Sequence, residues 1–226
     1  MALNPSEVEY LSFSHALAHQ PIPTILSSLS TALPGMLLGN SNQLSWTMMQ
    51  VYLSDSVCWR YVETSPTANH LSFCKALDPA DNASINSKYT KPFRLSYVVT
   101  LAAHQLSTDL HVTNTSFADT LEFQALLHNY LRAPADQVVI SPLQNLSYYD
   151  KTEVTEEARA IPKIETRAQV DVRRYTDSVY ENAPLEYDIS WPTGKVEIKA
   201  THFKDLVVWN PQQEGQKIGD MEENGW

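Results

Sequence analysis

From Phe93 onward the chain is a succession of short runs in which apolar and polar residues alternate. β-branched and aromatic residues dominate these runs, and turn-forming residues stand between several of them. Alternation with a period of two is typical of strands that are buried on one face and joined by tight turns. The pattern predicts an all-β antiparallel fold. The clearest runs span 93–101, 106–115, 138–141, 175–180 and 196–200.

Two pairs of runs are predicted hairpins. The runs 93–101 and 106–115 are separated by a short polar link, and the sequence Trp191-Pro192-Thr193-Gly194 separates 187–190 from 196–200. Proline and glycine at such points favour a reversal of the chain. In contrast, residues 151–167 are rich in charged side chains and mix them with apolar residues without alternation, which predicts a loop or a single turn of helix.

Composition limits the classes of function. The chain has 226 residues, with 16 basic and 26 acidic side chains and a net charge of −10. Such an acidic balance argues against nucleic acid as a partner, because phosphate backbones require a basic face. No apolar run is long enough to span a bilayer, and no secretory leader is recognisable, so we expect no membrane partner and a cytoplasmic location.

The chain changes character near residue 90. Residues 1–90 are rich in Ser, Thr, Leu, Met and Pro, and neither helical periodicity nor alternation is sustained there. Residues 91–226 carry the alternating runs. We therefore predict an atypical, poorly patterned N-terminal segment at 1–90 and a β-sandwich domain at 91–226.

The stretch 123–132 carries the first candidate for chemistry. The stretch is predicted to be a strand that is buried on one side. Its apolar face is formed by Phe123, Ala125, Leu127 and Leu131, while His128 stands among polar residues on the other face. A histidine that faces a polar cleft is a candidate acid or base, since imidazole titrates near neutral pH. On this stretch alone, the ordinary interpretation is a half-exposed histidine without chemistry.

The remaining candidates lie near the C-terminal end. Asp177 opens a strand-like run and could be a carboxylate in a cleft, although aspartate at such a point is commonly a cap or turn residue. Trp209 and Asn210, followed by proline, could offer a stacking face and an amide to a sugar, or could be a core tryptophan and an ordinary turn. No phosphate-binding loop, nucleophile elbow or metal-ligand spacing occurs, so we predict no metal and no cofactor.

Together these pieces resemble a known family. The run from about Pro92 to Trp226 is similar to the glucose-6-phosphate 1-epimerases, the hexose-6-phosphate mutarotase branch of the aldose 1-epimerase family, and most similar to the fungal members. The order and spacing of the pieces match as well. The matching pieces are Tyr97–Leu101, Leu110–Asn114, Phe123–Arg132, Leu143–Lys151, Thr176–Pro184 and Asp205–Pro211.

The resemblance implies a galactose-mutarotase-like β-supersandwich. It also implies an isomerase that interconverts the α and β anomers of a hexose 6-phosphate, D-glucose 6-phosphate first, without metal or organic cofactor. By the same resemblance, His128 is the general acid on the ring oxygen and Asp177 binds sugar hydroxyls.

The chain departs from the family pattern in several places. The family's base is a glutamate in a segment that would follow Trp226, and its second histidine and phosphate-binding arginine belong to a segment that is replaced here by 33–41. On this basis we expect a sandwich that is incomplete and truncated at its C-terminal end, with activity close to the uncatalysed rate. The alternatives are a non-catalytic carbohydrate-binding β-sandwich and an inactive truncated family member.

Overall fold

The computed structural model confirms an all-β antiparallel architecture. It describes residues 2–3, 8–17, 34–38, 47–50, 60–62, 70–78, 86, 91–102, 105–127, 129, 131 and 133–217. Within these ranges nearly every regular element is a strand. The exceptions with defined bounds are a single helical turn, α3 (Glu156–Arg159), and a short 3₁₀ helix, η2 (Gln212–Lys217).

The chain divides into two compact units, which are described separately. The first comprises Met1–Ser14 and Gln20–Leu131, and the second comprises His15–His19 and Arg132–Trp226. The sequence boundary near residue 90 concerns the character of the sequence and stays a prediction.

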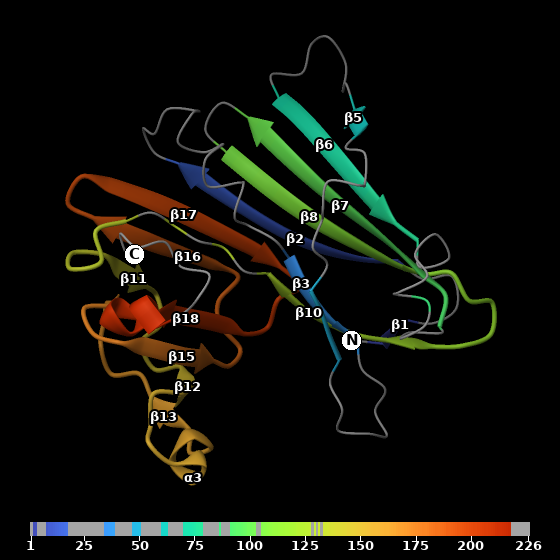
Figure 1. The fold of residues 1–226 in the computed structure, drawn as a ribbon. Helices are drawn as coiled ribbons and strands as arrows, with labels where there is room; N and C mark the ends of the chain where they lie inside the picture. Colours follow the sequence, from blue (N-terminus) through green and yellow to red (C-terminus); the bar gives the residue numbers. More distant parts are fainter. Residues whose placement is uncertain are drawn as a thin grey trace. The chain divides into compact units, whose positions relative to one another are not determined.

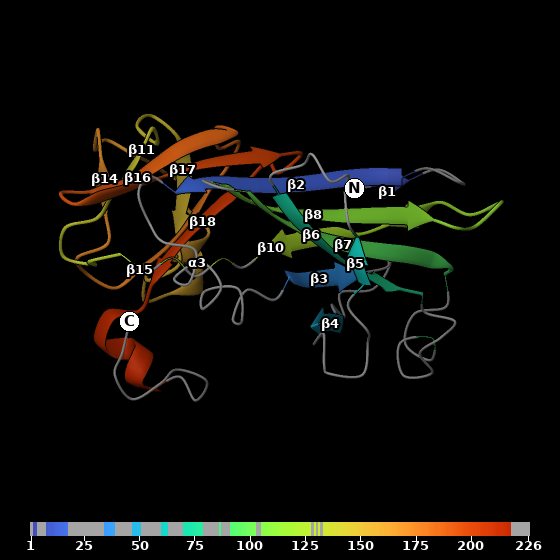
Figure 2. The ribbon, with the colours of Figure 1, turned by 90° about the horizontal axis from the view of Figure 1, so that it is seen from above.

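The first unit contains the predicted hairpin of 93–101 with 106–115. The strands β7 (Phe93–Ala102) and β8 (Gln105–Asn114) are antiparallel, in register from Phe93 opposite Asn114 to Leu101 opposite Leu106. Every second residue of β8 is buried from Leu106 onward, so one face is apolar and the other is half-exposed. The prediction of a hairpin is confirmed. Figure 1 shows β6, β7 and β8 running side by side, and Figure 2 shows the same strands from above.

Other strands complete the description of the N-terminal part. Those with described pairings are β1 (Ala2–Leu3) with β9 (Leu121–Glu122), β3 (Pro34–Leu38) with β4 (Thr47–Gln50) and with β10 (Gln124–Leu127), and β5 (Arg60–Val62) with β6 (His70–Leu77). The strand β2 spans Val8–Leu17.

The predicted strand at 123–132 is shorter than expected. Its regular part is β10, which ends at Leu127, and Asn129 and Leu131 lie outside any strand. Phe123 separates β9 from β10 and is 2% exposed, so the chain breaks its pairing where this ring enters the core. His128 and Arg132 lie outside the described residues.

The second unit is a sandwich of two antiparallel sheets. Four neighbouring strands of one sheet follow the order β14 (Val170–Asp171), β11 (Val139–Ser141), β16 (Glu186–Trp191), β17 (Gly194–Thr201). The other has the order β13 (Lys163–Ile164), β12 (Ser147–Asp150), β15 (Thr176–Tyr180), β18 (Leu206–Asn210). Figure 1 shows β16 beside β17 and β15 beside β18.

A single apolar cluster lies between these two sheets. Ile140 and Val170 come from the first sheet, and Tyr180 and Val208 come from the second. Burial of such side chains is the main favourable term in folding, about 1.5–3 kcal/mol for each large apolar group. The cluster therefore fixes which face of each sheet points inward.

The hairpin predicted around Trp191–Gly194 and the helical turn predicted within 151–167 are both present. Residues 192–193 link β16 to β17, and Thr155 caps α3 by accepting a hydrogen bond at Oγ1 from the Ala158 amide at 3.2 Å. Threonine at this position satisfies an amide that the helix itself cannot pair. In the part of the chain with described placement, no helix is long and apolar enough to cross a membrane.

Candidate functional site

Two predicted site residues, Asp177 and Trp209, lie directly opposite each other on β15 and β18. In β15 the side chains of Thr176, Ser178 and Tyr180 are buried, whereas Asp177 is half-buried. Alternation along the strand therefore places Asp177 on the outer face of the sheet, and the antiparallel register places Trp209 on the same face.

The neighbouring strand β12 extends this outer face. Tyr149 lies opposite Val179, and the backbone amide of Lys151 donates to the carbonyl oxygen of Asp177 at 2.8 Å. Because residues two apart share a face, the outer surface consists of two rows across β12, β15 and β18. We call it the three-strand face. The first row is Lys151, Asp177 and Trp209, and the second is Tyr149, Val179 and Val207.

This face is only partly covered. Val207 is 44% exposed, and Lys151 is exposed, while Tyr149 and Trp209 are half-buried. Along β18 only Val208 is buried, while Leu206 and Trp209 are half-buried. The strand has one face in the core and one face that can meet a ligand.

The electrostatic setting of Asp177 combines burial with opposing charges. Burial raises the pKa of Asp177 above its ordinary value, and the nearby Asp150 carboxylate adds to the rise, while Lys151 and Arg159 oppose it. The ammonium of Lys151 lies over the ring of Tyr149, with Nζ 5.1 Å from the ring centroid. A half-buried carboxylate, two aromatic rings and a cation thus share one surface.

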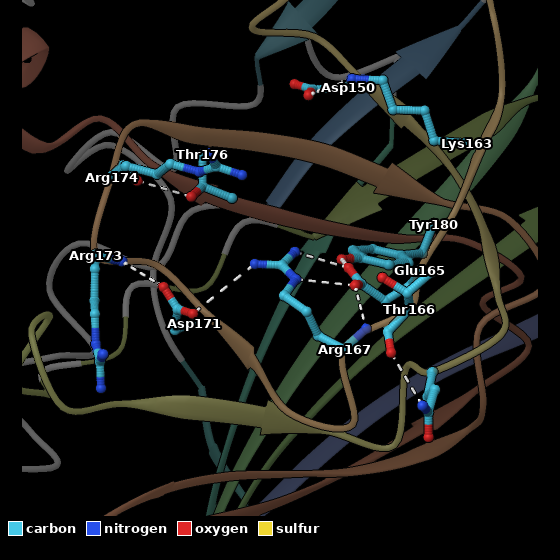
Figure 3. Close-up of polar contacts among 11 residues, drawn as sticks. Asp150, Lys163, Glu165, Thr166, Arg167, Asp171, Arg173, Arg174, Thr176 and Tyr180 are labelled. Carbon is cyan, nitrogen blue, oxygen red and sulfur yellow. Dashed lines mark hydrogen bonds and ion pairs between the residues drawn. The ribbon is translucent and has the colours of Figure 1, made fainter.

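A buried carboxylate fixes β15 from the inner side. The Tyr180 hydroxyl donates to Glu165 Oε2 at 2.8 Å, and Arg167 donates from Nε to Oε1 at 2.9 Å and from Nη2 to Oε2 at 2.8 Å. Glu165 is 2% exposed, and Figure 3 shows the Arg167 guanidinium pointing toward it. Burial alone would raise the pKa of Glu165, but these hydrogen bonds outweigh it and hold the pKa below its ordinary value.

A second ionic group holds the turn that follows β12. Lys163 Nζ lies 2.8 Å from Asp150 and 2.6 Å from Glu153, and the Thr152 amide and hydroxyl both donate to Asp150. Burial opposes ionisation of Asp150, but its hydrogen bonds with Lys163 and Thr152 lower its pKa. This arrangement fixes the backbone at the point where Lys151 leaves the strand.

A comparison with protein families decides the identity at the family level. The model of the aldose 1-epimerase family matches residues 53–225, which include every strand of the three-strand face. The chain belongs to the aldose 1-epimerase family. A search of curated proteins gave no match. The observed antiparallel β-sandwich agrees with the fold of this family.

Family membership implies the interconversion of sugar anomers. A carboxylate accepts hydrogen bonds from sugar hydroxyls, and an aromatic ring packs against the apolar face of a sugar. The three-strand face brings Asp177 and Trp209 together in this arrangement. Among the described residues, no group of His, Cys, Asp and Glu side chains could hold a metal ion.

Of the other two predicted site residues, the structure describes only Asn210. Asn210 lies opposite Thr176, so it shares the inner face with Thr176 rather than the outer face with Asp177. Its side-chain oxygen accepts a hydrogen bond from the Gln212 amide at 3.0 Å, which starts η2. The amide oxygen of Asn210 is thus engaged in a turn. His128 lies outside the described residues, so its role stays a prediction.

Sequence reasoning did not find Glu165, Arg167 or Lys151 as members of this region. The charged stretch 151–167 was interpreted only as a loop or a single turn of helix. A signal existed in the short spacing of Glu165 and Arg167 within it, but only the fold shows that this pair meets Tyr180.

Proposed function

We propose that the protein interconverts the α and β anomers of a hexose 6-phosphate, with D-glucose 6-phosphate as the first candidate. Two findings support the proposal: membership in the aldose 1-epimerase family, and the position of Asp177 directly opposite Trp209 on a half-exposed sheet face. The second observation carries the most weight, because it places a carboxylate that can bind hydroxyls next to an aromatic ring that can stack on a sugar.

The proposed reaction opens and recloses the sugar ring. An acid protonates the ring oxygen while a base takes the proton of the C1 hydroxyl, and the bond between C1 and the ring oxygen breaks. Rotation about C1–C2 and reclosure, with the protons returned, give the other anomer. The reaction needs no electron transfer and proceeds by acid–base chemistry alone.

We assign the acid to His128, because an imidazole with a pKa near 6.5 can give and regain a proton at neutral pH. Asp177 binds hydroxyls of the sugar, and Trp209 packs against the sugar ring. Asn210 acts indirectly, because its hydrogen bond from the Gln212 backbone amide fixes the turn that ends β18. A cytoplasmic location, without nucleic-acid or membrane partners, is proposed on the sequence alone.

The test follows the optical rotation of freshly dissolved α-D-glucose 6-phosphate with and without the protein. The protein is used at concentrations comparable to those of the sugar, so that slow turnover is visible. We expect only a small acceleration of mutarotation over the rate in buffer, and a still smaller one in Asp177→Asn. Rotation that relaxes at the buffer rate, although the sugar is bound, would contradict the proposal.

A second function is a carbohydrate-binding sandwich without catalysis. The observation that favours it is that the three-strand face provides a carboxylate, aromatic rings and a cation, and binding alone requires no base. Saturation-transfer NMR that shows sugar binding while anomer exchange stays at the buffer rate would favour this function over the first.

A further inference from the structure

We propose that Lys151 is the residue by which the three-strand face selects phosphorylated hexoses, its ammonium binding the phosphate while Asp177 and Trp209 hold the sugar. This inference rests on the proposed function and adds to it the group that determines the substrate class. It follows from the position of Lys151, from the absence of an ion pair to Lys151 within 4 Å among the described residues, and from the charge of the whole chain.

The position of Lys151 is set by backbone pairing. Its amide donates to the carbonyl oxygen of Asp177, which continues the register in which Asp150 lies opposite Ser178. Lys151, Asp177 and Trp209 therefore form one row across three neighbouring strands. Adjacent strands lie about 4.8 Å apart, so the backbone positions at the two ends of the row are about 10 Å apart. A hexose with one phosphate substituent is of comparable length.

The ammonium of Lys151 lies over an aromatic ring and interacts with the Asp177 carboxylate only at longer range. Its Nζ lies 5.1 Å from the centroid of the Tyr149 ring, which attracts a cation through its π face and leaves the charge in place. Among the described side chains, no carboxylate lies within 4 Å of it, whereas Lys163 nearby is engaged by both Asp150 and Glu153. Lys151 can therefore donate to an incoming anion.

Charge makes such a residue necessary. The chain carries a net charge of −10, which repels an anionic substrate as it approaches. Asp177 adds a carboxylate to the same row. A phosphate can bind beside these groups only where a cation compensates it, and lysine binds phosphate as a compact charge with three donors. Lys151 supplies that cation at the end of the row.

The decisive experiment compares how the wild-type protein and Lys151→Gln bind glucose 6-phosphate and glucose, by NMR titration of each sugar. The variant removes the charge and keeps much of the length of an exposed side chain. We expect Kd for glucose 6-phosphate to rise about fivefold, as for the loss of one exposed ion pair. The Kd for glucose should not change. Lys151→Arg should keep the preference for the phosphorylated sugar.

Lys204→Gln is the matched control, because Lys204 is also exposed in the same unit and the substitution changes the net charge by the same amount. It should leave both affinities at the wild-type values. If Lys204→Gln weakens glucose 6-phosphate as much as Lys151→Gln does, the effect is one of overall charge and the inference is wrong.

The two proposals fail in different ways. If the wild-type protein exchanges the anomers of glucose 6-phosphate but Lys151→Gln keeps the full preference over glucose, the role of Lys151 is refuted and the proposed function stands. If the wild-type protein does not bind glucose 6-phosphate at all, both are refuted.

Discussion

The Tyr180 hydroxyl donates a 2.8 Å hydrogen bond to the carboxylate of Glu165, which is 2% exposed. This contact joins the last residue of β15 to the loop that follows β13. Since β15 also carries Asp177 on its opposite face, the inner hydrogen bond and the outer binding group belong to one strand. The stability of the inner contact and the function of the outer face should therefore be separable by mutation.

Glu165→Gln is expected to lower the free energy of unfolding by about 2–3 kcal/mol. The substitution removes the charge that accepts both short hydrogen bonds of the Arg167 guanidinium, leaving Arg167 only its 4.0 Å contact with Asp171, and weakens the hydrogen bond from Tyr180. Breaking a buried ion pair is costly. Urea unfolding measures the loss. Glu186→Gln, which breaks the exposed pair with Lys199, is the control and should change the free energy by about 0.5 kcal/mol or less.

The difference in the free energy of unfolding between the wild-type protein and Glu165→Gln is expected to depend on pH. The folded-state pKa of Glu165 is depressed, so its contribution to stability is present above the ordinary pKa of glutamate and is lost as the pH falls through the depressed value. The difference between wild type and Glu165→Gln should therefore shrink in acid. A difference that stays constant as the pH is lowered would contradict the assignment.

Asp177→Asn should weaken sugar binding and slightly stabilise the fold. Burial raises the pKa of Asp177, so its ionised form costs stability near neutral pH, and a neutral amide removes that cost. The carboxylate's hydrogen bonds to sugar hydroxyls are lost, which we expect to raise Kd about tenfold. The stabilisation should disappear at a pH below the ordinary pKa of aspartate. Thermal unfolding and NMR titration provide the two readouts. A destabilised variant would contradict the stability argument, and an unchanged Kd would contradict the binding role.

Trp209→Ala should reduce sugar affinity about fivefold, because the packing of an aromatic ring is worth about 0.5–1.5 kcal/mol. Trp209→Phe keeps an aromatic face and should retain most of the affinity. Saturation-transfer NMR measures both variants on the same sugar. Equal affinity of the alanine variant and wild type would remove Trp209 from the site.

Gly194→Ala should destabilise the hairpin of β16 and β17. A Cβ atom at Gly194 would lie 2.5 Å from Cζ2 of the Trp191 ring, its opposite residue in the register. Overpacking of this kind costs about 1–3 kcal/mol. The unfolding midpoint in urea should fall, while Thr193→Ala, an exposed change in the same turn, should leave it almost unchanged.

The sequence predicts the strands well where alternation and turn residues agree. The runs that became β7, β8, β15 and β17 are examples, because each buries one face and their pattern states which. The sequence predicts the bounds of a strand poorly where pairing with a neighbouring strand determines them. In the stretch 123–132 the regular strand covers only Gln124–Leu127, because Phe123 is buried outside the ladder and Asn129 and Leu131 lie outside any strand.

The candidate site is predicted only in part for the same reason. Asp177 and Trp209 were recognised as candidates separately, but their opposition requires β15 and β18 to pair, and β16 and β17 lie between them in sequence. No local pattern specifies that pairing. Asn210 was predicted beside them, yet a one-residue step along a strand reverses the face, so it lies opposite Thr176 instead.

The central claim is that the three-strand face serves the exchange of sugar-phosphate anomers. NMR exchange spectroscopy on equilibrated α- and β-D-glucose 6-phosphate tests it most directly, because binding and exchange are read in the same sample. The account predicts cross-peaks between the two anomeric protons that grow with protein concentration and weaken in Asp177→Asn. Anomeric protons that exchange only at the buffer rate, at protein concentrations that saturate the sugar, would contradict it.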